Sequence, residues 1–120
     1  MNFLSHYYLD HQIDDSLFVV GASTPDLLSI FDRKIKFKEG EISRRVQNRE
    51  VTAEQQSFYQ GVIRHFQVDK LFHSSDFFVA ETAQLSHQLR VAFPNAQIQR
   101  SFFVAHILLE LTLDRLLIQQ

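Results

Sequence analysis

The chain has 120 residues, a formal net charge of −2 at pH 7, no cysteine and no tryptophan. This length predicts one domain over residues 1–120, and an apolar fraction of 45% is sufficient for a packed core. The absence of cysteine excludes disulfides, thiolate metal sites and a cysteine nucleophile. The charge argues against nucleic-acid binding. No apolar run reaches the roughly 18 residues of a membrane span, and no secretory signal opens the chain, so we expect a cytoplasmic protein.

The first half of the chain predicts short helices. Residues 2–11 can form an opening helix, followed by a turn at Asp14 and Asp15. An apolar run over residues 16–21 leads into Gly21-Ala22-Ser23, whose small side chains suit close helix packing. Pro25 predicts that a new helix starts there, because it disfavours helical geometry for Thr24. Residues 33–49, with seven of the twelve Lys and Arg and only two Glu, predict a loop or a short exposed helix.

The second half predicts three longer helices. Thr52 and Gln55 form a T-x-x-Q capping box, and the helix that it starts should reach about residue 74. Ser74 or Ser75 can cap the next helix, which should end near Pro94. Asn95 can cap the last helix, whose residues 102–118 are apolar almost all round, as in a buried central helix or an oligomer interface. We therefore expect an all-α, single-domain bundle of four to six helices.

Histidines and acidic residues recur at helical spacing. Four of the six histidines precede an acidic residue by four positions, where chance predicts about 0.7 such pairs in a random sequence. Two of these pairs extend to triplets on one helix face. One triplet is His65, Asp69 and His73, and the other is His106, Glu110 and Asp114. Imidazole and carboxylate ligands on facing helices are typical of metal sites in bundles, and they suit Mn, Zn or Fe.

Two other interpretations of these histidines stay open. A histidine on an apolar helix is often a hydrogen-bonded core residue, and pairs four residues apart also stabilise ordinary helices. His11 and His87 lack a comparable setting, and we expect both on the surface. No glycine-rich phosphate loop and no nucleophile elbow is present in the sequence.

Three segments carry a resemblance to known families. They are M-N-F-L-S-H-Y-Y-L at residues 1–9, G-A-S-T-P-D-L-L at residues 21–28 and G-V-I-R-H-F-Q-V-D-K-L-F-H at residues 61–73. They resemble the acyl carrier protein phosphodiesterase family, and the matching residues are His6, Asp26, Gly61, His65 and Asp69. The order of histidines and acids is also similar to that of zinc-dependent phospholipase C-like, all-helical metallohydrolases. The chain departs from the first family at Phe72-His73, where a Thr-Asp pair is typical, and from the second in lacking tryptophan.

The resemblance implies a metal-dependent phosphodiesterase, acting on the phosphopantetheine linkage of acyl carrier protein or on another acidic phosphodiester. The expected ligands of the divalent metal are His6, Asp26, His65, Asp69, His73, His106 and Glu110. Among these, Asp26, Asp69 and Glu110 are the expected catalytic residues. Asp10 or Asp114 could accept hydrogen bonds from ligand histidines. In the basic segment, Arg44 and Arg45 are expected to bind the substrate by electrostatic attraction.

A function of a different class is also consistent with the sequence. The chain could be a non-catalytic helical protein that forms a homo-oligomer through its last helix and retains a His/acid cluster. The basic segment would then be a solvated surface, or would bind acidic proteins.

Overall fold

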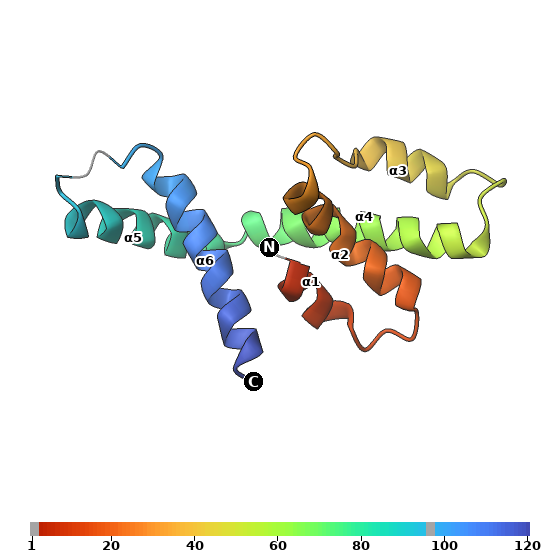
Figure 1. Cartoon of the computed structure of the whole chain (residues 1–120), viewed down its shortest axis with the longest axis horizontal. Helices are drawn as coiled ribbons and strands as arrows, with labels where there is room; N and C mark the ends of the chain where they lie inside the picture. Colours follow the sequence, from red (N-terminus) through yellow and green to blue (C-terminus); the bar gives the residue numbers. More distant parts are fainter. Residues whose placement is uncertain (1–2, 96–97) are drawn as a thin grey trace. The chain divides into compact units, whose positions relative to one another are not determined.

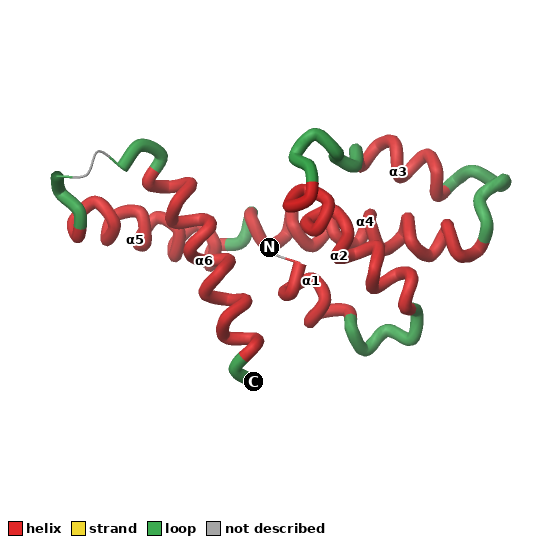
Figure 2. Tube along the Cα trace, viewed as in Figure 1, coloured by secondary structure: helices red, strands yellow, loops and turns green. Residues whose placement is uncertain are grey.

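All regular secondary structure in the described part of the chain is helical. The computed structural model describes residues 3–95 and 98–120 and has six helices there, with no strand (Figures 1 and 2). The helices are α1 (Phe3–Asp10), α2 (Ser16–Phe31), α3 (Glu39–Val46), α4 (Ala53–His73), α5 (Asp76–Ala92) and α6 (Ser101–Ile118). The prediction of an all-α chain with four to six helices is confirmed. The chain divides into two compact units, residues 1–70 and 71–120, and the single-domain expectation stays a prediction.

Helix α2 runs without a break through Pro25, so the prediction of a new helix at this point is wrong. Asp15 caps its first turn by accepting from the Phe18 amide at 3.0 Å. Proline removes one backbone donor within the helix. The Thr24 hydroxyl, however, donates to the Val20 carbonyl at 2.6 Å and the Ser23 hydroxyl to the Val19 carbonyl at 3.3 Å. Both accepting carbonyls lie in the turn before Pro25, although the carbonyl that loses its i+4 donor at Pro25 is that of Gly21.

The predicted caps of α4 and α5 are confirmed. Gln55 donates its amide to the Thr52 hydroxyl at 3.2 Å, and its side chain accepts from the Thr52 amide at 3.1 Å. Ser75 accepts from the Phe78 amide at 3.1 Å. Asn95 does not cap the last helix, because α6 begins at Ser101 after Arg100 in the left-handed region. That prediction is wrong, since α6 starts without a side-chain cap.

Two glycines allow α2 and α4 to cross in direct backbone contact. A Cβ at Gly21 would meet the Phe58 carbonyl, and a Cβ at Gly61 would meet the Phe18 carbonyl. The prediction of close helix packing at residues 21–23 is therefore confirmed. Helix α1 packs against α2 in the same unit, and α3, a short exposed helix as predicted, lies beside the first half of α4 (Figure 1).

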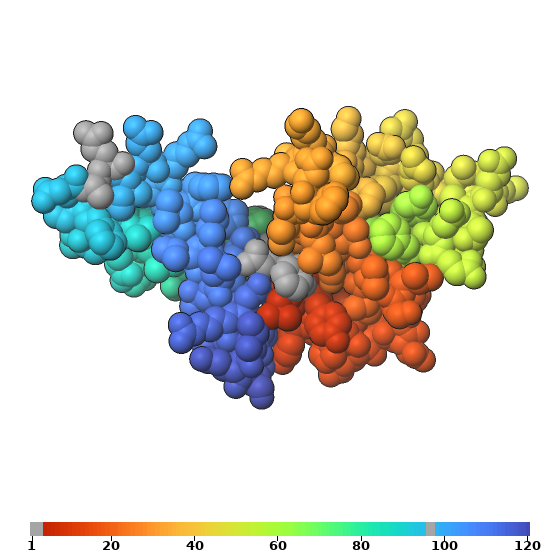
Figure 3. All heavy atoms as spheres, in the orientation of Figure 1, coloured from red at the N-terminus to blue at the C-terminus, as the bar shows by residue number. Residues whose placement is uncertain are grey.

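In the second unit, α5 and α6 pack against each other. Only Ser101, Ala105 and Leu109 of α6 are buried, and Figure 3 shows α6 side chains uncovered on the visible face of this unit. The prediction of a buried central helix is wrong within this unit, because a single partner helix covers only one stripe of α6. None of the described helices has both the length and the apolar character needed to span a membrane.

Candidate metal centre

Four side chains from three helices meet in the first unit. We call His6 of α1, Asp26 of α2, and His65 and Asp69 of α4 the His6–Asp69 cluster. His6 Nε2 lies 3.1 Å from Asp69 Oδ1 and 3.9 Å from Asp26 Oδ2. His65 Nε2 lies 3.6 Å from Asp69 Oδ2 and 3.8 Å from Asp26 Oδ1. Both imidazole Nε2 atoms therefore face the same two carboxylates.

The cluster is buried on its imidazole side and open on its carboxylate side. His6 is fully buried and His65 is 4% exposed, whereas the side chains of Asp26 and Asp69 are 25% and 28% exposed. The two rings stack with centroids 4.0 Å apart and an interplanar angle of 26°. Molecules from solvent can thus reach the cluster past the carboxylates.

A backbone hydrogen bond fixes the tautomer of His65. Its Nδ1 lies 2.9 Å from the Ala22 carbonyl, which can only accept, so Nδ1 carries the proton. Burial first, and the nearby His6 second, lower the pKa of His65 to about 4. At neutral pH the ring is therefore uncharged, and Nε2 presents a lone pair to the carboxylates of Asp26 and Asp69.

This arrangement suits a cation better than it suits an empty site. Burial acts to raise the pKa of Asp69, but the hydrogen bond from His6 contributes to holding it below its usual value. The carboxylate is thus ionised at neutral pH and faces the lone pair of His65 Nε2. Bonds of about 2.1 Å to one ion place neighbouring ligand atoms roughly 3.0–3.4 Å apart. The shortest observed separation, 3.1 Å, falls within this spacing, and the other three, 3.6–3.9 Å, exceed it by up to about 0.5 Å.

Asp10, by contrast, does not orient a ligand histidine. It is 3% exposed and accepts three hydrogen bonds from the Arg64 guanidinium, each of 3.3 Å. The acceptor for His65 is instead the Ala22 carbonyl. His6 Nδ1 is buried and has no hydrogen-bond partner among residues 3–95 and 98–120. The expectation for Asp10 is wrong, because its carboxylate pairs with Arg64, the residue that precedes His65 on α4.

The other three expected ligands meet in the second unit. We call His73, His106 and Glu110 the His73–Glu110 cluster. Glu110 Oε1 lies 3.1 Å from His73 Nε2 and 2.9 Å from His106 Nε2, and both rings contact Phe78 edge-on. Burial acts against ionisation of Glu110, yet its pKa lies below the usual value, and the two histidine hydrogen bonds contribute to this lowering. Two Nε2–H donors can satisfy one carboxylate oxygen, so this cluster is also stable without an ion.

The sequence predicted seven metal ligands as one set, and the structure divides them between the two units. His6, Asp26, His65 and Asp69 form one group, and His73, His106 and Glu110 form the other. Asp114 is not among the residues of either cluster, and its expected role stays a prediction. His11 and His87 are exposed, as predicted.

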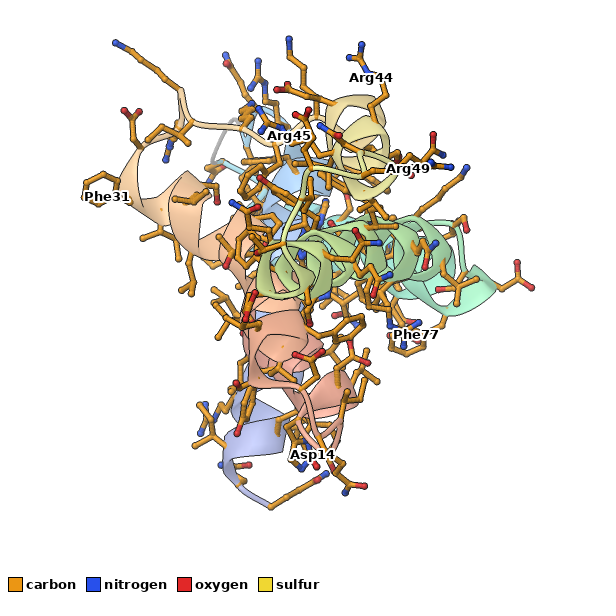
Figure 4. The ribbon with its side chains drawn as sticks, turned by 90° about the vertical axis from the view of Figure 1, so that its right-hand side faces the viewer. Asp14, Phe31, Arg44, Arg45, Arg49 and Phe77 are labelled. Carbon is orange, nitrogen blue, oxygen red and sulfur yellow. The ribbon has the colours of Figure 1, made fainter. Side chains whose placement is uncertain are left out.

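Arg44 and Arg45 lie on α3 and outside both clusters. The Arg44 Nε donates to the Gly40 carbonyl at 3.2 Å, and Arg45 pairs with Glu41 at 3.4 Å. Figure 4 shows the Arg44 side chain pointing away from the ribbon. The role of the Ala22 carbonyl as the acceptor for His65 was not predicted, because a backbone acceptor has no side-chain pattern in the sequence. The small residues 21–23 did indicate that another helix approaches closely at this point.

Comparisons with protein-family models, with curated proteins and with solved structures found no match to this chain.

Proposed function

We propose that the first unit is a metal-dependent hydrolase of phosphodiesters, with the His6–Asp69 cluster as its metal centre. The observation that carries the proposal is the convergence of His6 Nε2, His65 Nε2 and two carboxylates on one point. Mixed nitrogen and oxygen ligands of this kind suit Mn, Zn or Fe. A bound divalent ion would supply Lewis-acid activation of water and of a phosphoryl oxygen.

The residues of the chain have separate tasks in this proposal. The buried rings of His6 and His65 would hold the ion, and the Ala22 carbonyl keeps the His65 ring in the required tautomer. Asp69 lies within 3.6 Å of both rings and completes the ligand set. Asp26, partly exposed at the open side, is placed to accept the proton of the attacking water.

Hydrolysis of bis-p-nitrophenyl phosphate tests this function. With added Mn²⁺, the wild-type chain should release p-nitrophenol, and Asp69→Asn should lower the rate at least about a hundredfold because it removes a ligand charge. Asp14→Asn is the matched control, since Asp14 is exposed in the same unit and lies in the loop after α1 (Figure 4). Equal rates for the two variants, or no rate for any of the proteins, would refute a phosphodiesterase centre here.

The proposal also names a specific substrate and a role for the second cluster. Acyl carrier protein, through its phosphopantetheine linkage, is the substrate that the sequence resemblance favours, with Arg44 and Arg45 attracting its acidic surface.

The His73–Glu110 cluster, with Glu110 as a further catalytic candidate, is proposed as a second cation site. His106→Gln should lower the metal content of the protein and leave the His6–Asp69 cluster loaded.

One observation favours a second candidate function, self-association without catalysis. Several large apolar side chains of α6 are exposed, among them Phe102, Phe103, Leu111, Leu116 and Ile118. Exposed apolar patches of this kind often mark contact surfaces. Light scattering on the wild type and on a Leu111→Glu/Leu116→Glu variant tests this function, which predicts an oligomer that the variant disrupts.

A further inference from the structure

A cavity of about 300 Å³ lies between the start of α3 and the first half of α4, apart from both His/acid clusters. It is lined by Lys36, Phe37, Lys38, Glu41, Arg45 and Tyr59, above the buried Ile42. This volume is at the lower end of the range for small-molecule sites. Neither His/acid cluster contributes a residue to the cavity.

The charge of the cavity favours an anion. Three cationic side chains line it and only one acidic side chain, Glu41, opposes them. Glu41 is already paired with the Arg45 guanidinium at 3.4 Å. Lys36 and Lys38 are exposed and form no ion pair with any residue in the described ranges. Two ammonium groups are therefore available to an incoming ligand.

The walls of the cavity favour a ligand with a flat apolar part. Phe37 and Tyr59 line it, and the Arg45 guanidinium lies 6.0 Å from the centroid of the Tyr59 ring. Phe37 is held by edge contact with Phe58, with centroids 6.3 Å apart. The same two rings, Phe37 and Tyr59, also line an adjoining apolar cavity of about 360 Å³ next to Leu17 and Phe58. A ring between these walls would gain both stacking and burial.

We infer that this cavity binds a small organic phosphate that carries an aromatic ring, such as an aryl or nucleoside phosphate. Lys36 and Lys38 would contact the phosphate oxygens, and the ring would lie against Phe37 and Tyr59. Arg45, which pairs with Glu41 and lies 6.0 Å from the Tyr59 ring centroid, would add a third cation beside the ligand. The inference does not depend on the proposed metal centre, because no residue of either His/acid cluster lines the cavity; Arg45 is the one lining residue that the proposed substrate attraction also uses.

Titration of the full ¹⁵N-labelled chain with phosphonates, which have no ester bond to hydrolyse, tests the inference. Phenylphosphonate should shift the amide signals of residues 36–45 and of Tyr59, and bind about tenfold more tightly than methylphosphonate, which lacks the ring. Lys36→Gln/Lys38→Gln should weaken phenylphosphonate binding about tenfold. Tyr59→Leu should remove the preference for the ring, so that both phosphonates bind with similar affinity.

The matched control is Lys34→Gln/Arg49→Gln, which removes two exposed cations of the same basic segment that do not line the cavity. This control should bind phenylphosphonate within about twofold of the wild type, because screening weakens distant surface charges. Equal weakening in the control and in the lysine variant would overturn the inference in favour of general attraction by the segment. Equal affinity of the wild type for both phosphonates, or shifts centred on His6 and His65, would overturn it as well.

Discussion

Acidification should destabilise the chelator-treated protein through His65. The buried ring has a pKa of about 4 in the folded chain and 6.5 as its ordinary value. The unfolded chain therefore binds the proton more readily between these values. This difference does not lower the free energy of unfolding above pH 6.5. As the pH falls from 6.5 towards 4, proton binding by the unfolded chain lowers it progressively. Between pH 8 and pH 5 the linkage relation gives a loss of about 2 kcal/mol from this one group.

Urea unfolding at both pH values in EDTA measures this loss. His65→Asn is the informative variant, because its amide can still donate to the Ala22 carbonyl but cannot titrate. The wild type should lose about 2 kcal/mol more than this variant over the same pH interval. His87→Asn, at an exposed position, should lose as much as the wild type. A difference below about 0.5 kcal/mol between the wild type and His65→Asn would refute a buried, neutral His65.

Three further perturbations test the scaffold and the ligands. Gly61→Ala should lower the free energy of unfolding by about 1–3 kcal/mol, because its Cβ would meet the backbone of α2. Gly40→Ala, where the structure has open space, should instead stabilise α3 by up to about 1 kcal/mol. The reverse order of the two variants in urea titrations would contradict the close crossing of α2 and α4. Arg64→Met should cost about 2 kcal/mol, because it leaves the buried carboxylate of Asp10 without its donor; no cost in the same titration would show that the pair is not formed. Asp69→Asn should raise the dissociation constant for Zn²⁺ at least about tenfold in competition with a chromogenic chelator, and an unchanged constant would remove Asp69 from the ligand set.

The sequence predicted helix starts correctly where local capping residues determine them. The predictions were wrong where contacts between helices determine the structure. The T-x-x-Q box at Thr52 and the serine before Asp76 act within one turn, so the sequence predicts both helix starts correctly. Pro25 led to a wrong boundary because one proline removes only a single backbone hydrogen bond, and the contact of this segment with α4 at Gly21 supports a continuous α2. The apolar α6 was expected to be a buried central helix or an oligomer interface, and periodicity alone does not say how many partner helices cover it.

The candidate site was predictable as a set of residues and not as an arrangement. Spacing by four placed His65 and Asp69 on one face of α4, as the structure shows. The contribution of His6 and Asp26 depends on how α1 and α2 meet α4, which is set by the close crossing at Gly21 and Gly61 and not by any local pattern. For the same reason, the division of the seven expected ligands into two clusters could not be derived from the chain order.

Metal content tests the central claim most directly. The protein, purified without a histidine tag, is dialysed against Mn²⁺ or Zn²⁺ and then against metal-free buffer, and bound metal is measured by mass spectrometry. A His6→Gln/His65→Gln variant should retain about one ion per chain less than the wild type, whereas His11→Gln/His87→Gln, which removes two exposed histidines, should match the wild type. Equal metal content in the wild type and in the His6→Gln/His65→Gln variant would contradict the metal centre.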